Sequence, residues 1–188
     1  PSLKAIIVEK PLGIDYKSSK IFIEKCLKRN IKVQVNFWRR GDSFFNELAN
    51  GGIEKMLGNI QVVYGIYGNG LKNNGSHMID MIRMLFGEID NYQKLNQIDE
   101  FVEGPIIEDK NIGFILNTRK GIPVIFSPVK FCFYRENGII IYGEKGRLDL
   151  LNEGISNKFF PSQPSRSTSG SNEVSYNNCV NLKCVSKL

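Results

Sequence analysis

The first 37 residues follow a strand–helix–strand pattern, and this pattern constrains the fold more than any other feature of the chain. Residues 3–8 form a nearly continuous apolar run, which is typical of a parallel strand buried on both faces. Residues 16–30 space apolar side chains as an amphipathic helix does, with Asp15 or Ser18 as the candidate N-cap. Residues 31–37 alternate between apolar and polar side chains, which indicates a second strand. We therefore predict a βαβ unit, the last one of a doubly wound parallel sheet.

Beyond the second strand the pattern changes to short helices and single strands. Residues 43–50 predict a short helix that ends at Gly51-Gly52. Residues 60–68 predict a strand, and residues 76–86 predict a helix with one apolar side.

From there to about residue 160 the chain consists of short β-segments bounded by turn residues. These segments are 91–98, 111–118, 122–133, 138–143 and 147–151. Residues 161–178 are rich in Ser, Asn and Pro, and we expect a loose loop or tail there.

The expected fold class is α/β (α+β): the end of a βαβ unit, then a predominantly antiparallel or mixed open sheet with helices on one face. The expected domains are residues 1–37, residues 38–160 and a loose polar tail at 161–188. A large sheet needs its second face covered, and no helices are left over to cover it. We therefore expect a homo-oligomer that forms through the open face.

Composition and charge exclude several classes of function. Lys and Arg number 25 against 19 Asp and Glu, a formal net charge of +6, but no run of five or more basic residues occurs. A solvated basic surface is one interpretation of this charge, and an anionic substrate such as a nucleotide sugar is the other. Nucleic acid is not expected as a partner, because basic and aromatic residues do not interleave. With no apolar stretch of membrane length and no signal peptide, we expect no membrane contact and a cytoplasmic location.

The cysteines do not predict a metal site. Cys26 and Cys132 lie within apolar patterns and are expected to be small buried hydrophobes. Cys179 and Cys184 lie in a polar segment with no matching His or Cys pair nearby, so a zinc site is not expected.

Two short motifs place proton-transferring side chains beside carboxylates. Glu9-Lys10-Pro11 closes the first strand, and residues 73–80 (Asn-Asn-Gly-Ser-His-Met-Ile-Asp) contain the only histidine, His77. If this segment is helical, Asn73, His77 and Asp80 share one face, and Asp80 can orient the imidazole. A lysine and a histidine are what proton transfer to and from a sugar hydroxyl requires. The alternatives are a helix-start histidine bonded to a loop carbonyl and a solvated lysine at a strand end.

These motifs resemble those of the glucose–fructose oxidoreductase / inositol dehydrogenase / rhizopine-catabolism family, usually written Gfo/Idh/MocA. The resemblance covers roughly residues 3–160. It implies a Rossmann domain for NAD or NADP followed by an α/β domain with an open sheet. It also implies that Lys10 is the catalytic lysine, and that Glu9, Lys10 and Pro11 border the cofactor.

The second family motif, roughly Gly-x-x-x-Asp-x-x-x-His-x-x-Asp, matches this sequence at His77 and Asp80. Its first Asp falls on Asn73, which belongs to the implied catalytic set but cannot act as a base. The implied substrate is the secondary alcohol of a sugar, a cyclitol or a nucleotide sugar. The candidate substrate-binding residues are Arg39, Arg40 and Asn74. For the two arginines, a salt-bridged junction is the alternative.

No dinucleotide-binding fingerprint occurs within the 188 residues. The glycines at 65–70 do not open a helix in a βαβ unit, so they are not a phosphate loop. The first hypothesis is therefore a fragment of an NAD(P)-dependent oxidoreductase that is inactive without its cofactor-binding part. The alternative is a non-catalytic module for oligomerisation or sugar binding. The sequence leaves open whether the chain is an enzyme on its own.

Overall fold

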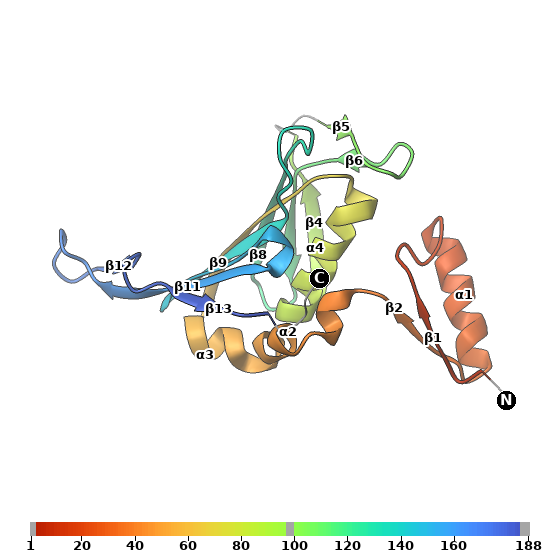
Figure 1. The fold of residues 1–188 in the computed structure, drawn as a ribbon, viewed down its shortest axis with the longest axis horizontal. Helices are drawn as coiled ribbons and strands as arrows, with labels where there is room; N and C mark the ends of the chain where they lie inside the picture. The colour runs from red at the N-terminus through yellow and green to blue at the C-terminus, as the bar shows by residue number, and fades with distance from the viewer. Residues whose placement is uncertain (1–2, 97–99, 185–188) are drawn as a thin grey trace. The chain divides into compact units, whose positions relative to one another are not determined.

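The structure, a computed structural model, describes residues 3–96 and 100–184. The chain divides into two compact units, Pro1–Trp38 and Arg39–Leu188 (Figure 1). The end of the expected strand at 91–98 lies outside the described residues, and so does the end of the expected tail at 161–188.

The first unit is the predicted βαβ unit. Strands β1 (Ala5–Val8) and β2 (Lys32–Val35) pair in parallel, and helix α1 (Tyr16–Lys28) connects them. Asp15 is the N-cap of this helix, because its carboxylate accepts a hydrogen bond from the Ser18 N–H at 2.7 Å. The Ser18 hydroxyl completes a capping box, so both candidates for the cap take part in it.

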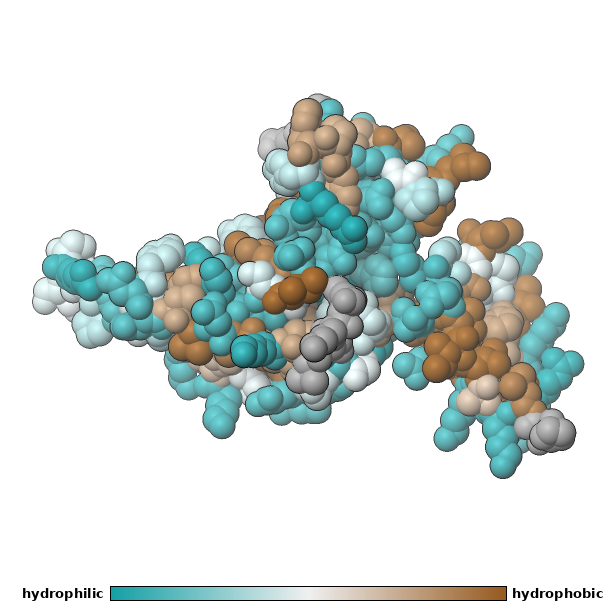
Figure 2. All heavy atoms as spheres, in the orientation of Figure 1, coloured by the Kyte–Doolittle hydropathy of each residue, from teal (hydrophilic) through white to brown (hydrophobic). Residues whose placement is uncertain are grey.

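Apolar side chains remain on the surface of the first unit (Figure 2). Ile7 is 72% exposed and Leu27 is 65% exposed, whereas Cys26 is buried in α1 as expected. Two strands and one helix bury little apolar area by themselves. These side chains therefore mark a surface at which further packing would remove apolar area from water.

The second unit is built on a large mixed sheet. Its strand order is β12-β11-β10-β9-β3-β8-β7-β4, and β13 pairs with β11. Neighbouring strands are antiparallel except β3 and β8, which are parallel. The strands are β3 (Ile60–Tyr67), β4 (Ile89–Lys94), β7 (Phe114–Thr118), β8 (Pro123–Pro128), β9 (Gly138–Gly143), β10 (Gly146–Leu151), β11 (Ser156–Pro164), β12 (Asn172–Val174) and β13 (Val180–Leu182). A separate short hairpin consists of β5 (Phe101–Val102) and β6 (Lys110–Asn111).

Short helices connect the strands and cover one face of this sheet. Helix α2 (Ser43–Glu47) continues through a π-helical turn at Leu48–Gly52 into α3 (Ile53–Leu57). The backbone leaves the helical conformation at Asn50 and Gly51, where Gly51 takes a φ of 96°, so the helical path is interrupted where the sequence predicts a helix end, and a second short helix follows. None of the helices in the described part of the chain is long and apolar enough to cross a membrane. The remaining helical segments are α4 (Ser76–Phe86), a π-helical turn at Leu71–Gly75, and 3-10 turns at Trp38–Gly41 and Asn152–Gly154.

The core lies between the helices and one face of the sheet. Along β3, Val63 and Tyr67 are fully buried, whereas Tyr64 is 47% exposed on the opposite face. At Gly65 a Cβ atom would lie 2.1 Å from the Phe126 ring, so only glycine admits this ring into the core. Other large, fully buried side chains come from the three helices and from β9 and β10: Phe45, Ile53, Leu57, Met78, Met81, Ile82, Phe86, Ile139, Ile141 and Leu148.

The segment after residue 160 differs from the loose tail that its composition predicts. Strand β11 runs into it, β12 folds back on β11, and β13 pairs with the other end of the same strand. The Ser175 N–H donates to the Pro161 carbonyl at 2.8 Å, and Ser175 is 2% exposed. Backbone hydrogen bonds form these strands, so polar side chains do not prevent them and hydropathy does not reveal them.

The other face of the sheet carries a row of apolar side chains. Ile115, Ile125, Tyr64 and Ile140 are direct neighbours across β7, β8, β3 and β9. The Tyr64 ring also packs edge-on against Tyr142, with 6.0 Å between the ring centroids. With Tyr64 47% exposed, the middle of this row is open among the residues that the structure describes.

Candidate functional site

The first motif lies where the two strands of the first unit end. Lys10 and Pro11 follow β1 and are joined by a cis peptide bond. The Glu9 carboxylate accepts a hydrogen bond of 2.7 Å from the side-chain amide of Asn36, a residue that follows β2 in the same way. The motif therefore lies at the carboxyl edge of a parallel pair, which is the edge at which open α/β sheets bind ligands. Asn36 was not among the sequence candidates.

The second motif lies at the entry to α4, whose bounds are those predicted. His77 is the second residue of this helix and is partly buried. Because residues 71–75 form a π-helical turn, regular α-helical spacing holds only from His77 to Asp80. Asn73 lies in that turn, where its side-chain amide donates to the Asn69 carbonyl at 3.0 Å. The candidate substrate-binding residue Asn74 is partly buried in the same turn.

The buried Asp80 forms an ion pair with the exposed Arg40. Asp80 is 7% exposed, and its two carboxylate oxygens accept bonds from Arg40 Nε at 3.0 and 2.9 Å and from Arg40 Nη2 at 2.8 Å. Of the two alternatives for Arg40, the salt bridge is the one that the structure shows. These bonds fix α4 to the segment that precedes α2. That Asp80 orients the imidazole of His77 stays a prediction.

Arg39 is buried, and its side chain contacts other parts of the second unit. The residue is 3% exposed, its Nη2 donates to the Glu153 carbonyl, and its guanidinium lies 5.8 Å from the centre of the Phe45 ring. Burial lowers the pKa of Arg39 to about 10, although the charges of Glu153 and Asp80 oppose this shift. These contacts lie within the protein, and a contact of Arg39 with a substrate phosphate stays a prediction.

The loop that follows β8 contains Phe131, Phe133 and Tyr134, and it lies beside the entry to α4; we call it the aromatic loop. A Cβ atom on Gly68 would lie 2.3 Å from the ring of Phe131, so the two segments are in close contact. Glu103 joins them further: its carboxylate accepts the Asn69 N–H at 3.1 Å and the Cys132 N–H at 3.3 Å. Cys132 is exposed, which differs from the buried position that its apolar surroundings predict.

The same loop presents two aromatic rings to solvent. Phe133 is 77% exposed and Tyr134 is 61% exposed. Exposed aromatic rings beside polar groups are suited to packing against the flat apolar face of a ligand. The sequence pattern predicts a strand over 122–133, but β8 ends at Pro128, and the loop was therefore not among the candidates.

The first unit lacks part of what a dinucleotide site needs. A phosphate commonly binds at the N-terminus of the helix that follows a strand. At α1 the Asp15 carboxylate already accepts the Ser18 N–H, and its negative charge repels a second anion. The residues present therefore do not fit a pyrophosphate. Among residues 3–96 and 100–184, no group of three or more His, Cys, Asp and Glu side chains could hold a metal ion.

No protein-family model and no curated protein sequence match the chain. Solved structures match its fold. The WlbA dehydrogenase from Bordetella pertussis in complex with NADH and UDP-GlcNAcA is 17% identical, with a TM-score of 0.64 over 79% of this chain and 51% of that one. An oxidoreductase from Pseudomonas syringae is 16% identical, with a TM-score of 0.70 over 95% of this chain and 49% of that one. A levoglucosan dehydrogenase in complex with NADH and levoglucosan is 20% identical, with a TM-score of 0.67 over 95% and 55%.

The chain thus spans about half the length of the structures it matches. At this level of identity the likeness establishes the fold alone. That fold is a mixed α/β architecture shared with oxidoreductases, two of which were crystallised with NADH.

Proposed function

We propose that the chain supplies the substrate-binding side of an NAD- or NADP-dependent oxidoreductase that acts on a secondary alcohol of a sugar, a cyclitol or a nucleotide sugar. The observation that carries the proposal is the position of the only histidine. His77 lies in the first turn of α4, one turn before the buried Asp80, which forms an ion pair with Arg40. The fold around it is shared with two dehydrogenases, one solved in complex with NADH and UDP-GlcNAcA and the other in complex with NADH and levoglucosan.

Each side chain has one task in the proposed chemistry. His77 accepts the proton of the substrate hydroxyl, since an imidazole can do so near neutral pH. Lys10 keeps the role that the resemblance implies, a cation that stabilises developing negative charge. Asp80 supports His77 by fixing α4 through Arg40, and Asn73 binds rather than relays a proton. The oxidation also needs a hydride acceptor, for whose pyrophosphate the N-terminus of α1 offers no site.

The substrate contacts are proposed to come from the elements around the entry to α4. Asn74 offers an amide for hydroxyl groups, and Phe133 and Tyr134 offer exposed rings for the apolar face of a sugar or a base. The formal net charge of +6 favours an anionic substrate such as a nucleotide sugar over a neutral one.

The proposal is testable on the 188-residue chain, because His77 provides the only histidine signal in its proton NMR spectrum. We would titrate the chain with UDP-sugars and with free sugars, and follow the His77 Cε1–H resonance. A His77→Gln variant identifies the resonance by removing it. We expect at least one ligand to shift the signal saturably.

The same chain should not oxidise NADH or reduce NAD⁺ measurably with any of these sugars, because it contains no phosphate loop. Turnover of either dinucleotide by the chain alone would show that the proposed inactivity is wrong. Binding of a sugar without any response of His77 would show that this residue does not belong to the substrate site.

The second candidate function is a non-catalytic module for self-association, which the apolar row on the open sheet face favours. We propose that the chain forms a homo-oligomer through Tyr64 and its neighbours. Light scattering after size exclusion should show an oligomer for the native chain and a monomer for Tyr64→Glu. Tyr92→Glu is the matched control, because Tyr92 is also exposed, at 78%, but lies on the edge strand β4. A monomeric native chain would count against this interface.

A further inference from the structure

The turn that leads into α4 has no cap of its own. Gly70 precedes the turn and Gly75 precedes α4, and neither position provides a side-chain cap. The first N–H groups of a helix then need acceptors from elsewhere. Here the acceptors come from the hairpin β5–β6, which lies 34 to 41 residues further along the chain.

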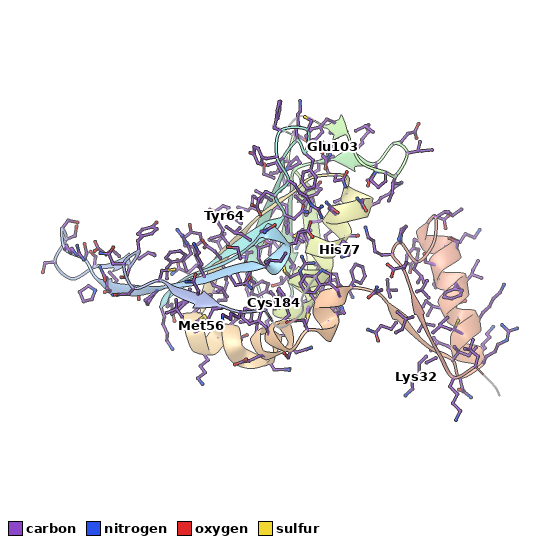
Figure 3. All side chains as sticks on the ribbon, viewed as in Figure 1. Lys32, Met56, Tyr64, His77, Glu103 and Cys184 are labelled. Carbon is purple, nitrogen blue, oxygen red and sulfur yellow. The ribbon has the colours of Figure 1, made fainter. Side chains whose placement is uncertain are left out.

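Three side chains of this hairpin, Glu103, Asp109 and Asn111, form what we call the clasp. The Asn69 N–H donates to Glu103 at 3.1 Å, the Gly70 N–H to Asn111 at 3.0 Å, and the Lys72 and Asn73 N–H groups to the two carboxylate oxygens of Asp109 at 2.9 Å each. Figure 3 shows Glu103 beyond the N-terminal end of the helix that carries His77. The clasp therefore holds the backbone of the entry turn from outside the helix.

Asp109 is the central residue of the clasp. It is 1% exposed, and it makes no salt bridge with any residue in the described part of the chain. A buried carboxylate is costly unless hydrogen-bond donors surround it. N–H groups at the start of a helix are suited to this task, because their bonds to a carboxylate are charge-assisted and the helix dipole favours a negative charge there.

Two glycines make this close contact possible. Gly70 has a φ of 95°, and a Cβ atom there would lie 2.1 Å from Asp109 Oδ2. Gly104 has a φ of 96°, and a Cβ atom there would lie 2.4 Å from the carbonyl oxygen of Asn69. A side chain at either position would displace the clasp or the entry turn.

The hairpin is hydrogen-bonded to two further parts of the second unit, strand β3 and the aromatic loop. Beyond β6, Ile112 is bonded to the buried strand β3, since the Tyr67 hydroxyl donates to its carbonyl at 2.7 Å and accepts from its N–H at 2.9 Å. Glu103 also accepts the Cys132 N–H of the aromatic loop. The clasp thus connects the core, the entry turn and the loop that bears the exposed rings.

We propose that Asp109, supported by Glu103 and Asn111, is a positioning residue that fixes the backbone of residues 69–73 and thereby the orientation of His77. Asp109 contacts no reacting atom in this scheme, because it acts through the Lys72 and Asn73 N–H groups. The inference rests on the proposed function of His77, but its test needs neither a ligand nor activity.

The test compares Asp109→Asn with a matched control, Glu144→Gln. Like Asp109, Glu144 accepts two hydrogen bonds from a distant segment, in this case from the backbone N–H and the side-chain amide of Asn59. Unlike Asp109, it lies in the β9–β10 turn. Native-state amide hydrogen exchange reports the protection of each N–H, and the His77 Cε1–H resonance reports the surroundings of the imidazole. For Asp109→Asn we expect the protection of the Lys72 and Asn73 amides to fall about 10- to 100-fold, as the loss of bonds to a charged acceptor predicts, and the His77 resonance to move.

The protection of amides in β9 and β10 should stay within about twofold of the native chain, and Glu144→Gln should leave the Lys72 amide, the Asn73 amide and the His77 resonance unchanged. A local loss of protection without movement of the His77 signal would overturn the proposal, and so would an equal loss across the whole sheet. If Asp109→Asn does not fold, Glu103→Gln replaces it, with the expected loss at the Asn69 amide and the same His77 readout. Failure of the proposed function would appear separately, as a native His77 signal that responds to no sugar.

Discussion

Replacing Asp80 with Asn and Arg40 with Met, singly and together, measures the coupling energy of the ion pair that fixes α4. Three N···O contacts of 2.8 to 3.0 Å join the two side chains, and Asp80 is 7% exposed. A hydrogen bond to a charged group contributes about 1.5–3 kcal/mol to stability. The Arg40 side chain is 41% exposed, so solvent screening lowers its share. We expect a coupling energy of about 1–2 kcal/mol from the double-mutant cycle.

The assay is urea unfolding of the four proteins, followed by far-ultraviolet circular dichroism. Arg40→Met should be more harmful than Asp80→Asn, because it leaves a buried carboxylate without its cation. The matched control is the pair of Arg83 and Glu88, which has similar geometry but side chains that are 44% and 54% exposed. A coupling energy for the Asp80 pair no larger than that of the control would refute the claim that this pair fixes α4.

Three further substitutions test local contacts. Burial raises the pKa of Tyr67 to about 12, so stability should fall as pH rises from about 10 towards that value, and one of the seven tyrosines should ionise last in an ultraviolet titration. Tyr67→Phe should abolish that late ionisation and cost about 1–3 kcal/mol in urea unfolding, because the Ile112 N–H and carbonyl lose their partner. Asn73→Asp puts an acceptor in place of the amide that donates to the Asn69 carbonyl, so urea unfolding should show a loss of stability at neutral pH that shrinks below about pH 4, where the carboxyl is protonated; an equal loss at both pH values would contradict this. The Ser18 N–H lowers the pKa of Asp15 below 3.8, so the support that Asp15 gives to α1 is lost as pH falls through that range, and amide exchange in α1 should lose this acid dependence in Asp15→Asn.

The elements that the sequence predicts well are those whose limits are set by their own side chains. Helix α4 has the predicted bounds because apolar residues fill one side of it and Gly87, with a φ of 88°, ends it. The hairpin of β9 and β10 is similar, since a turn at Glu144-Lys145 separates two apolar strands and sets their register. Local chemistry decides these cases, so a single sequence is enough.

The features that the sequence does not reveal depend on partners far along the chain. Arg39 and Arg40 are adjacent and chemically alike, yet one is buried against Glu153 and the other pairs with Asp80. The short strands β12 and β13 form because β11 offers them backbone groups. In the sequence, no pattern distinguishes the clasp residues Glu103, Asp109 and Asn111 from other polar residues. Only the fold brings them to the entry of α4.

Local contacts and contacts with distant parts of the chain meet at the entry to α4, where Asn73 takes part in both. Asn73 contributes its N–H to the clasp, and every residue except proline provides that group, so this bond to Asp109 does not depend on which side chain occupies position 73. The exchange of Asp for Asn therefore leaves the clasp in place; it changes the side-chain bond to the Asn69 carbonyl and the capacity for proton transfer. Because an amide cannot accept a proton near neutral pH, and because the oxygens of Asp80 accept three bonds from Arg40, proton transfer in the proposed function rests on the imidazole of His77.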